Sequence, residues 1–455
     1  MRWRTESGSS ALFWITLAVL LGYANALGGP FQFDDHNVIV NEPQVHGWAN
    51  WFAALANGIR PLLKFSYTLN WTLGWGTTGF HLTNLLVHLA NAWLVYLLAQ
   101  AFVLQQWQKY RLRHVALLTA LLFALHPVHT EAVTYISGRS ASLMTLFYLA
   151  GLLGYIRGRT EEDWKLLYLF TPVLFLLALA TKETAVTFPL ALLAWELCCG
   201  GRWQAALRPM WASWAVLCIA TLFFLFNDSY ATQIQRSAGF NDMQGNLATH
   251  LAGFIWLLRQ WALPLWLNID PDLPKLDGIG DALWPLAIMI GLVAITITSW
   301  RRRPWISFAL VWAMLQLIAL YLYLPRIDIA NERQLYLAGW PLLLALGAEL
   351  ALRFDTRMLL AAAAALLLAC AGLTVQRNRD YASEIALWED TVQKSPHKAR
   401  VHNNLGHAYL LAQRHEEARK EFLTALELDP TLYQAQHNLY RTDDEMEKAG
   451  GTLRP

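Results

Sequence analysis

Long apolar runs separated by short polar stretches limit what this chain can fold into. The runs approach the roughly 17–25 residues that a helix needs to cross a lipid bilayer. Only 15% of the residues are charged, whereas soluble domains carry roughly 25%. The sequence therefore predicts an all-α polytopic membrane protein with about eleven transmembrane helices in contact with lipid. The expected spans cover 11–28, 81–103, 114–126, 140–156, 165–180, 184–199, 210–226, 283–300, 305–324, 335–352 and 358–376.

Clusters of Lys and Arg predict how these spans are oriented. Cytoplasmic loops carry an excess of both residues, and the clusters between the runs all fall on one side if the N-terminus is cytoplasmic. The opposite, outer side then receives the loops 29–80 and 227–282 and the C-terminal region. The run 250–266 would move Arg301–Arg303 to the outer side if it spanned. We therefore expect this run to lie at the outer surface or to be re-entrant.

The first apolar run admits a second interpretation. A basic start, an apolar centre and the sequence Ala24-Asn25-Ala26 resemble a secretory signal peptide with its cleavage site. We favour a retained span. In either case the following loop lies on the outer side.

Charge and cysteine content exclude several classes of function. The formal net charge is +2, and the basic residues lie between apolar runs, so they form no stripe that would bind nucleic acid. The four cysteines lie in or beside apolar segments, without the spacing of a disulfide framework or of a metal site. We interpret them as packing residues.

The region 377–455 differs from the rest because it is polar, charged and helix-forming. Within it, 399–432 matches the helix-turn-helix pattern of a tetratricopeptide repeat of about 34 residues. Residues 384–396 resemble the second half of a preceding repeat, and 433–446 the first half of a following one. An unrelated helical hairpin is the alternative, although several positions of the pattern agree at once. These positions are Leu405, Gly406, Tyr409, Ala418, Phe422, Ala425 and Pro430.

The first outer loop begins with an acidic pair, Asp34 and Asp35, beside Phe31 and Phe33. Two adjacent carboxylates at a membrane surface suit a general base or a cation ligand, because low dielectric and mutual repulsion raise the pKa of one of them. The alternative is a solvated loop pair. The closeness of a span and the flanking aromatic residues favour the functional interpretation.

Further along the same loop, Arg60, Lys64 and Tyr67 recur at helical spacing and are expected to share one face. An amphipathic interfacial helix with snorkelling cations explains the spacing equally well. His81, Asn84 and His88 lie on one face at the top of the second span, and His81 is a candidate for substrate contact. For Asn84 and His88 the alternative is a hydrogen bond to a neighbouring helix.

The stretch HPVHTEAVTYISGR places His126, His129, Glu131 and Arg139 at the outer surface. The two histidines and Glu131 permit a metal site, but Pro127 disfavours a regular ligand helix. We prefer a polar mouth in which Arg139 pairs with an anion.

Two more outer turns carry charges: Lys182 and Glu183 in one, Glu332 and Arg333 in the other. Ion pairs that stabilise short turns are the alternative for both. Three cations, Arg139, Lys182 and Arg333, nevertheless project to the outer side, and together they favour an anionic ligand such as a phosphate.

These stretches together resemble a known family. The motifs that carry the resemblance are FDDHNVIVNEP, RPLLKFSYTLNW, GFHLTNLLVHL, LLFALHPVHTEAVTYISGRS, LATKETAVTFPL, NERQLYLAGWPLLL and RNRDYASEIALWEDTVQKSP. The order is similar to that of the transmembrane and tetratricopeptide repeat-containing proteins, which are protein O-mannosyltransferases in animals. The resemblance covers nearly the whole chain and is weakest near 227–282.

The resemblance implies a GT-C glycosyltransferase fold over 1–376, with the active site in the outer loop 29–80, and a tetratricopeptide repeat region over 377–455. It implies a polyprenyl-phosphate-linked sugar donor and inversion at the anomeric carbon. Asp34 and Asp35 would be the catalytic pair, and one of them would take the proton of the acceptor hydroxyl. The acidic pair permits a divalent cation without requiring one.

The short repeat array departs from the animal members and leaves the acceptor open. We expect a bacterial inner-membrane enzyme that uses undecaprenyl phosphate, works on the periplasmic side, and modifies Ser or Thr of an exported protein such as a pilin-like surface protein. The repeat region would dock that protein. Transfer to a lipid-linked glycan or lipopolysaccharide is an alternative, as is a membrane scaffold without enzymatic activity. A transporter is disfavoured, because no matched pair of Gly- or Pro-broken spans is evident.

Overall fold

The computed structural model describes residues 8–106, 113–200, 203–232, 243–276, 278–318 and 329–451. Within these ranges the regular structure is helical, and no β-strand is present, as the apolar runs predict. The α-helices are α1 (Gly8–Tyr23), α2 (Trp48–Ala54), α3 (Pro61–Leu73), α4 (Gly76–Gln106), α5 (Arg113–Leu125), α6 (Thr130–Val133), α7 (Arg139–Glu161), α8 (Thr171–Thr181), α9 (Phe188–Trp195), α10 (Trp203–Phe226), α12 (Met243–Ala262), α13 (Leu283–Ser299), α14 (Pro304–Leu317), α15 (Leu335–Ala338), α16 (Trp340–Arg353), α17 (Thr356–Asp380), α18 (Glu384–Lys394), α19 (Ala399–Leu411), α20 (His415–Leu428) and α21 (Tyr433–Gly451).

Six helices of the described ranges are long and apolar enough to cross a membrane, or up to eight if each of two bent helix pairs is one span. The predicted number of about eleven spans is therefore not confirmed. Every predicted run is helical where it is described, but some form short helices, such as Leu166–Thr181 and Pro304–Leu317. Pro172, Pro189 and Pro304 each lie in the first turn of a helix, and this restarts the helix inside or beside an apolar run.

Three predicted segments are covered only in part. Positions 319–324 of the run 305–324, positions 233–242 and 277 of the loop 227–282, and positions 452–455 of the repeat region lie outside the described residues. The run 250–266 begins within α12, which does not meet the length and composition criteria for a span. Its position relative to the membrane, and the side on which each loop lies, remain predictions.

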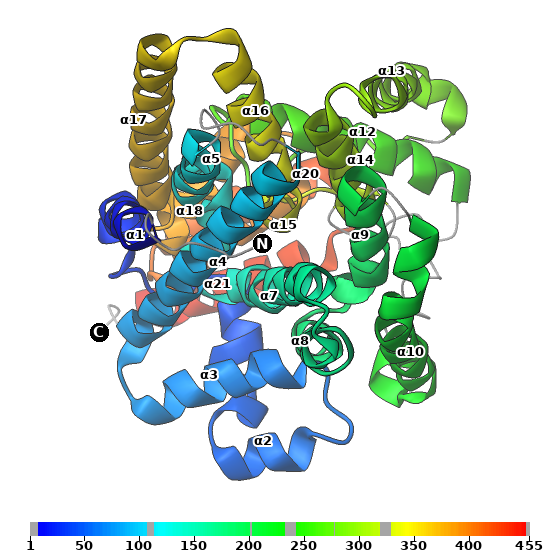
Figure 1. Cartoon of the computed structure of the whole chain (residues 1–455). Helices are drawn as coiled ribbons and strands as arrows, with labels where there is room; N and C mark the ends of the chain where they lie inside the picture. The colour runs from blue at the N-terminus through cyan, green and yellow to red at the C-terminus, as the bar shows by residue number, and fades with distance from the viewer. Residues whose placement is uncertain are drawn as a thin grey trace.

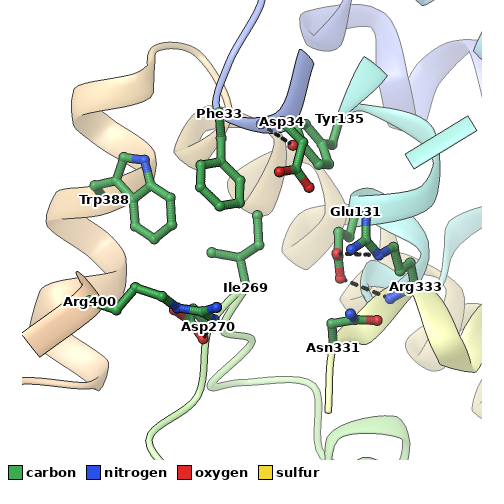
Figure 2. Close-up of a pocket in the computed structure, with 10 residues that line it drawn as sticks. All are labelled: Phe33, Asp34, Glu131, Tyr135, Ile269, Asp270, Asn331, Arg333, Trp388 and Arg400. Carbon is green, nitrogen blue, oxygen red and sulfur yellow. Dashed lines mark hydrogen bonds and ion pairs between the residues drawn. The ribbon is translucent and has the colours of Figure 1, made fainter. Parts of the chain in front are cut away.

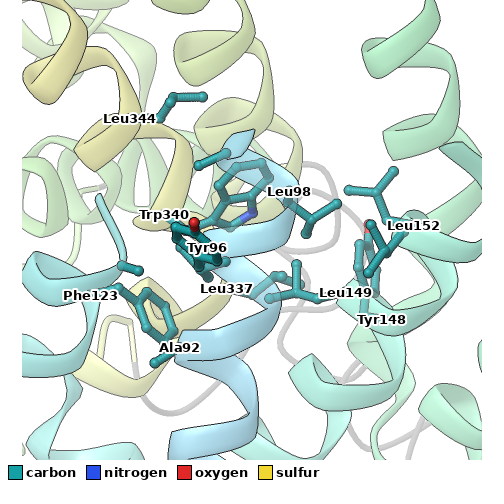
Figure 3. Packing of buried hydrophobic residues seen from close by; sticks show 14 of the residues in the cluster. Ala92, Tyr96, Leu98, Phe123, Tyr148, Leu149, Leu152, Leu337, Trp340 and Leu344 are labelled. Carbon is teal, nitrogen blue, oxygen red and sulfur yellow. The ribbon is translucent and has the colours of Figure 1, made fainter. Parts of the chain in front are cut away.

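The main core lies between α4, α5, α7 and α16 (Figure 3). Large rings fill it, among them Trp312 and Trp340, which are fully buried and meet edge to face with ring centroids 5.5 Å apart. Side chains such as Ile219, Phe226 and Leu368 instead point outward and are exposed. Because lipid is as apolar as these side chains, close packing of the rings holds the helices together more than apolar burial does.

Helix α1 belongs to this core. Ile15, Val19 and Tyr23 are buried in it, and α1 packs beside α5 and α17 (Figure 1). The side chain of Asn378 donates to the carbonyl of Gly22 at 2.9 Å, which joins the ends of the two helices. Cleavage after Ala26 would therefore remove a helix that fills the main core.

Helix α17 passes the predicted boundary at 376 and ends at Asp380, directly before the C-terminal helices. Arg377, which is only 4% exposed, lies at this junction. Its guanidinium contacts Glu332 at 3.2 Å, Asp380 at 2.9 Å and Asp390 at 2.8 Å. The membrane part and the C-terminal region are thus joined by a buried ion cluster.

Helices α19 and α20 form the predicted helix-turn-helix, with α18 before it and α21 after it. Phe422 and Ala418 of α20 pack against Gly406 of α19 in a shared core. A Cβ atom at Gly406 would lie 2.7 Å from the Phe422 ring. The close helix crossing that the sequence predicts is present.

Gly406→Ala should lower the apparent Tm of the purified full chain, because the added methyl group must displace the Phe422 ring. We expect a loss of about 1–3 kcal/mol. Gly372→Ala is the matched control, since a Cβ there meets nothing within 4 Å and alanine is the better helix former. Limited proteolysis of the C-terminal region should follow the same order, and equal behaviour of the two variants would contradict this packing.

Candidate active site

The two adjacent acids, Asp34 and Asp35, have different surroundings. Asp35 is 1% exposed, and its carboxylate accepts hydrogen bonds from the backbone amides of Gln32 at 3.0 Å and Ser137 at 2.8 Å. Burial raises the pKa of Asp35 to about 7, against the opposite effect of these two amides. The carboxylate of Asp34 instead points into a pocket (Figure 2). Asp35 therefore holds the loop through the backbone amides, and Asp34 faces the pocket.

The backbone around Asp34 is fixed by groups from distant parts of the chain. The Asp34 amide donates to the hydroxyl of Tyr135 at 2.9 Å, and the Phe33 amide donates to Glu384 at 3.3 Å. Phe33 has a φ of 46°, a left-handed conformation that costs a residue other than glycine about 1–2 kcal/mol. The Phe33 ring also packs edge to face on Trp388, 5.0 Å away. These contacts hold a strained turn in place.

Two further hydrogen bonds hold the start of the loop. The side chain of Gln32 donates to the carbonyl of Tyr381 at 2.6 Å, and His81 Nε2 lies 3.0 Å from the carbonyl oxygen of Gly29. The predicted site residue His81 thus contacts the loop backbone from helix α4. Its role in the structure is to position the loop.

The pocket combines three parts of the chain and has about 310 Å³ of free space, its open mouth included. The first outer loop and the 126–139 stretch form one wall, and Asn331 and Arg333 form a second. Trp388 and Arg400 of the C-terminal helices, with the segment that holds Asp270, close the remaining side (Figure 2). The lining residues are Phe33, Asp34, Glu131, Tyr135, Ile269, Asp270, Asn331, Arg333, Trp388 and Arg400.

Asp270 anchors the C-terminal region at this pocket. Its carboxylate contacts Lys398 at 2.6 Å and Arg400 at 2.5 Å. The hydroxyl of Ser395 donates to the Asp270 carbonyl at 3.0 Å and accepts from the side chain of Asn268 at 2.8 Å. The repeat region is therefore a wall of the pocket and is not a separate appendage.

Among the predicted cations, Arg333 is the one that lines this pocket. It is 18% exposed, and its guanidinium lies 3.4 Å from Glu131, which also accepts from the Arg333 amide at 2.8 Å. Glu332, its neighbour, is buried and pairs with Arg377. The predicted pair Glu332–Arg333 therefore divides, with Glu332 turned to the interior and Arg333 to the pocket.

Arg60 and Glu183 form a second ion pair, with their side chains 2.8 Å apart. The charge of Glu183 raises the pKa of Arg60 above its usual value, and the positive charge of Arg333 partly opposes this shift. Burial alone would raise the pKa of Glu183, but the charge of Arg60 outweighs it and lowers that pKa. Lys182 follows α8 directly and is 6% exposed. Segments far apart in sequence thus bring Arg60, Lys182 and Arg333 close enough for their charges to affect the same ionisable groups.

Arg139 has a different role from the predicted one. It is fully buried, and its guanidinium donates to Asn84 at 2.5 Å, to Asn70 at 2.6 Å and to the carbonyl of Phe80 at 2.8 Å. It also lies 5.0 Å from the centre of the Tyr67 ring. Because protein acceptors surround it, Arg139 joins α3, α4 and α7 and does not present its charge to an anion.

Lys64 also turns away from the pocket, since its ammonium group contacts Glu42 at 3.4 Å and Gln44 at 2.5 Å. It does not share one helical face with Arg60, because α3 begins at Pro61, after Arg60. His126 stacks on Trp261, and His129 Nδ1 lies 2.8 Å from the Phe123 carbonyl.

The residues do not favour a metal ion in this site. The described part of the chain has no group of three or more His, Cys, Asp or Glu side chains arranged to hold one. Each oxygen of the Asp35 carboxylate already accepts one backbone amide, which leaves it fewer lone pairs for an ion beside Asp34.

Sequence reasoning missed Tyr135, Asp270, Trp388 and Arg400. Tyr135 and Trp388 lie within the stretches that carry the family resemblance, so a signal was present. Charged side chains are the stronger signal of a site in a sequence, whereas an aromatic residue in a helical segment is ordinarily a packing residue. Asp270 and Arg400 carry charge, but only the tertiary structure brings them to the pocket.

Comparison with known proteins is consistent with this architecture. Residues 399–432 match the tetratricopeptide repeat. A protein O-mannosyl-transferase of Caenorhabditis elegans is 26% identical over 95% of this chain and 64% of its own length. One of Mus musculus is 27% identical over 87% and 64%. The chain is a relative of the protein O-mannosyl-transferases. The resemblance inferred from the sequence is thereby confirmed.

A protein O-mannosyl-transferase of Drosophila melanogaster is 34% identical, over 42% of this chain and 22% of its own length. The chain spans less than two thirds of the length of each of these relatives. No solved structure matches the chain.

Asp35→Asn should change how stability depends on pH. The folded-state pKa of Asp35, about 7, lies above the unfolded value of about 3.9, so the folded protein binds the extra proton between these values. The contribution of Asp35 to stability is present at low pH and is lost as the pH rises through 7, by at most about 1.4 kcal/mol per pH unit.

The wild-type apparent Tm should therefore rise more between pH 8 and pH 5 than that of Asp35→Asn. The variant should also have the lower Tm at pH 5, because an amide cannot accept both backbone hydrogen bonds equally. Thermal unfolding in detergent measures both effects. Parallel pH profiles would contradict the assignment.

Proposed function

We propose that this protein is an integral membrane glycosyltransferase that transfers a single sugar from a polyprenyl-phosphate donor to Ser or Thr hydroxyls of a protein. The observation that carries the proposal is the Asp34 carboxylate, which points into the same pocket as the cation Arg333 (Figure 2). A base and a phosphate-binding cation are the two groups that this reaction requires. The names of the relatives support the reaction class.

Asp34 is the proposed catalytic base. The acceptor oxygen attacks the anomeric carbon of the sugar, and Asp34 takes the hydroxyl proton as the new C–O bond forms. The bond between the anomeric carbon and the phosphate oxygen breaks on the opposite face, and the phosphate leaves with the electron pair. This displacement inverts the anomeric configuration. Asp35 and Tyr135 are positioning residues that hold the Asp34 backbone.

The leaving phosphate is the proposed ligand of Arg333, Lys182 and Arg60. Glu131 pairs with Arg333, and Glu183 with Arg60. Cations beside the leaving oxygen stabilise the second negative charge that develops on the phosphate as its bond to the anomeric carbon breaks. Carboxylates that hold arginine side chains in fixed positions lower the cost of ordering them when the donor binds.

The proposed acceptor is an exported protein on the periplasmic side of a bacterial inner membrane. The repeat region supports a protein partner, and Trp388 and Arg400 place it at the pocket itself. Deletion of 384–455 would remove a pocket wall and so would abolish transfer to any acceptor. It therefore cannot separate a protein acceptor from a lipid-linked glycan. Point variants are required.

Asp34→Asn should abolish the sugar modification, with a loss of at least about 100-fold expected for removal of a general base. Intact masses of envelope proteins from cells that lack the gene, complemented with each variant, measure this loss. The apparent Tm should stay near wild type, unlike that of Asp35→Asn. Asp281→Asn is the matched control, because Asp281 is exposed and lies outside the pocket. A full mass shift in Asp34→Asn cells would exclude Asp34 as the base.

A further inference from the structure

A second, larger pocket lies between the first outer loop and the repeat helices. It has about 1130 Å³ of free space, its open mouth included. The π-helical turn His36–Val40 and the following residue form one side, and α19 and α21 form the other. We call it the repeat groove. It is lined by Phe33, His36, Asn37, Asn41, Glu384, Asn403, Asn404, His407, Leu411, Tyr433, Gln434, His437 and Asn438.

Phe33 connects the repeat groove to the candidate active site, because it lines both pockets. The next residue along the chain is Asp34, and Glu384, which binds the Phe33 amide, also lines the groove. A molecule that lies along the groove therefore reaches the catalytic carboxylate by crossing the Phe33 ring.

The repeat groove is rich in neutral amide side chains. Asn37 and Asn41 come from the first outer loop, and Asn403, Asn404 and Asn438 from the repeat helices. None of the lining residues is Lys or Arg, so the groove is not built for a phosphate, a nucleic acid or an anionic lipid. Its one carboxylate, that of Glu384, lies 3.5 Å from His36. The amide side chains offer hydrogen-bond donors and acceptors to a partner without anionic groups.

The amides of the repeat helices are only partly satisfied by one another. Asn438 donates to Asn403 at 3.0 Å, and Asn403 donates to Asn404 at 3.3 Å. The amide nitrogen of Asn404 is buried and has no hydrogen-bond partner among the described residues. An unpaired buried donor is costly, and rotation of the Asn404 side chain toward a ligand carbonyl in the groove would remove that cost.

We propose that the repeat groove binds an extended segment of the acceptor protein by its backbone, and that the segment crosses Phe33 to bring a Ser or Thr hydroxyl to Asp34. An extended chain offers an N–H and a C=O group at each residue, which the carboxamides can pair with in turn. The assignment of the hydroxyl to Asp34 rests on the proposed function, whereas binding of the segment does not.

The test is a binding measurement on the full chain in lipid nanodiscs. The probe is a fluorescent peptide of about a dozen Ser, Thr, Ala and Gly residues without charged side chains. Gln434→Ala/Asn438→Ala should weaken binding at least tenfold. Gln436→Ala is the matched control: Gln436 lies on the same helix but does not line the groove, and binding should be unchanged.

A second variant guards against a folding defect. Gln434→Ala/His437→Ala changes two exposed groove residues and should also weaken binding, with an unchanged apparent Tm. Failure of the wild type to bind the peptide, or equal binding by groove and control variants, would overturn the proposal. Binding of a mannose oligosaccharide in place of the peptide, lost in the same variants, would also overturn it and would indicate a glycan acceptor.

The assignment of Asp34 as the base is tested separately from peptide binding in the repeat groove. Asp34→Asn should bind the peptide as the wild type does while it transfers no sugar. Transfer that persists in Asp34→Asn, with peptide binding still lost in the groove variants, would reject the catalytic base and retain the groove.

Discussion

The buried ion cluster around Arg377 is the interaction on which the arrangement of this molecule depends. A charge in the interior is costly unless it is paired, and Arg377 is paired with acids from three segments: Glu332, Asp380 and Asp390. Glu332 precedes the pocket cation Arg333, and Asp390 lies on α18 two residues after the pocket residue Trp388. One guanidinium therefore sets the position of the pocket cation and of the repeat wall together.

The acidic pair illustrates how adjacent residues of one chemistry acquire different roles. Asp34 and Asp35 begin a helical turn that continues into the π-helical turn His36–Val40. Successive side chains of a helix point about 100° apart, so Asp35 meets the amides of Gln32 and Ser137 while Asp34 meets the pocket. Phe33, which has a left-handed backbone conformation, directly precedes this turn.

Local patterns in the sequence predicted the helical membrane fold, the central repeat and the acidic loop, because each rests on periodicity or spacing within a few dozen residues. The sequence did not predict that Arg139 would be surrounded by Asn70, Asn84 and Phe80. An arginine next to a loop can bind an external anion or hydrogen-bond to neighbouring helices, and the sequence alone does not distinguish the two. Nor did it predict the repeat wall. The partners Asp270 and Arg400 are 130 positions apart, and no periodic signal links them.

The loop that carries Asp34 is held by residues that are synthesised about 350 positions later. Gln32 binds Tyr381 across 349 positions and Phe33 binds Glu384 across 351. A growing chain can insert α1 early, but it cannot complete this site until α17 and α18 have followed. The pocket is therefore among the last parts of the molecule to assemble, and a chain that stops short of α18 forms no complete pocket around Asp34.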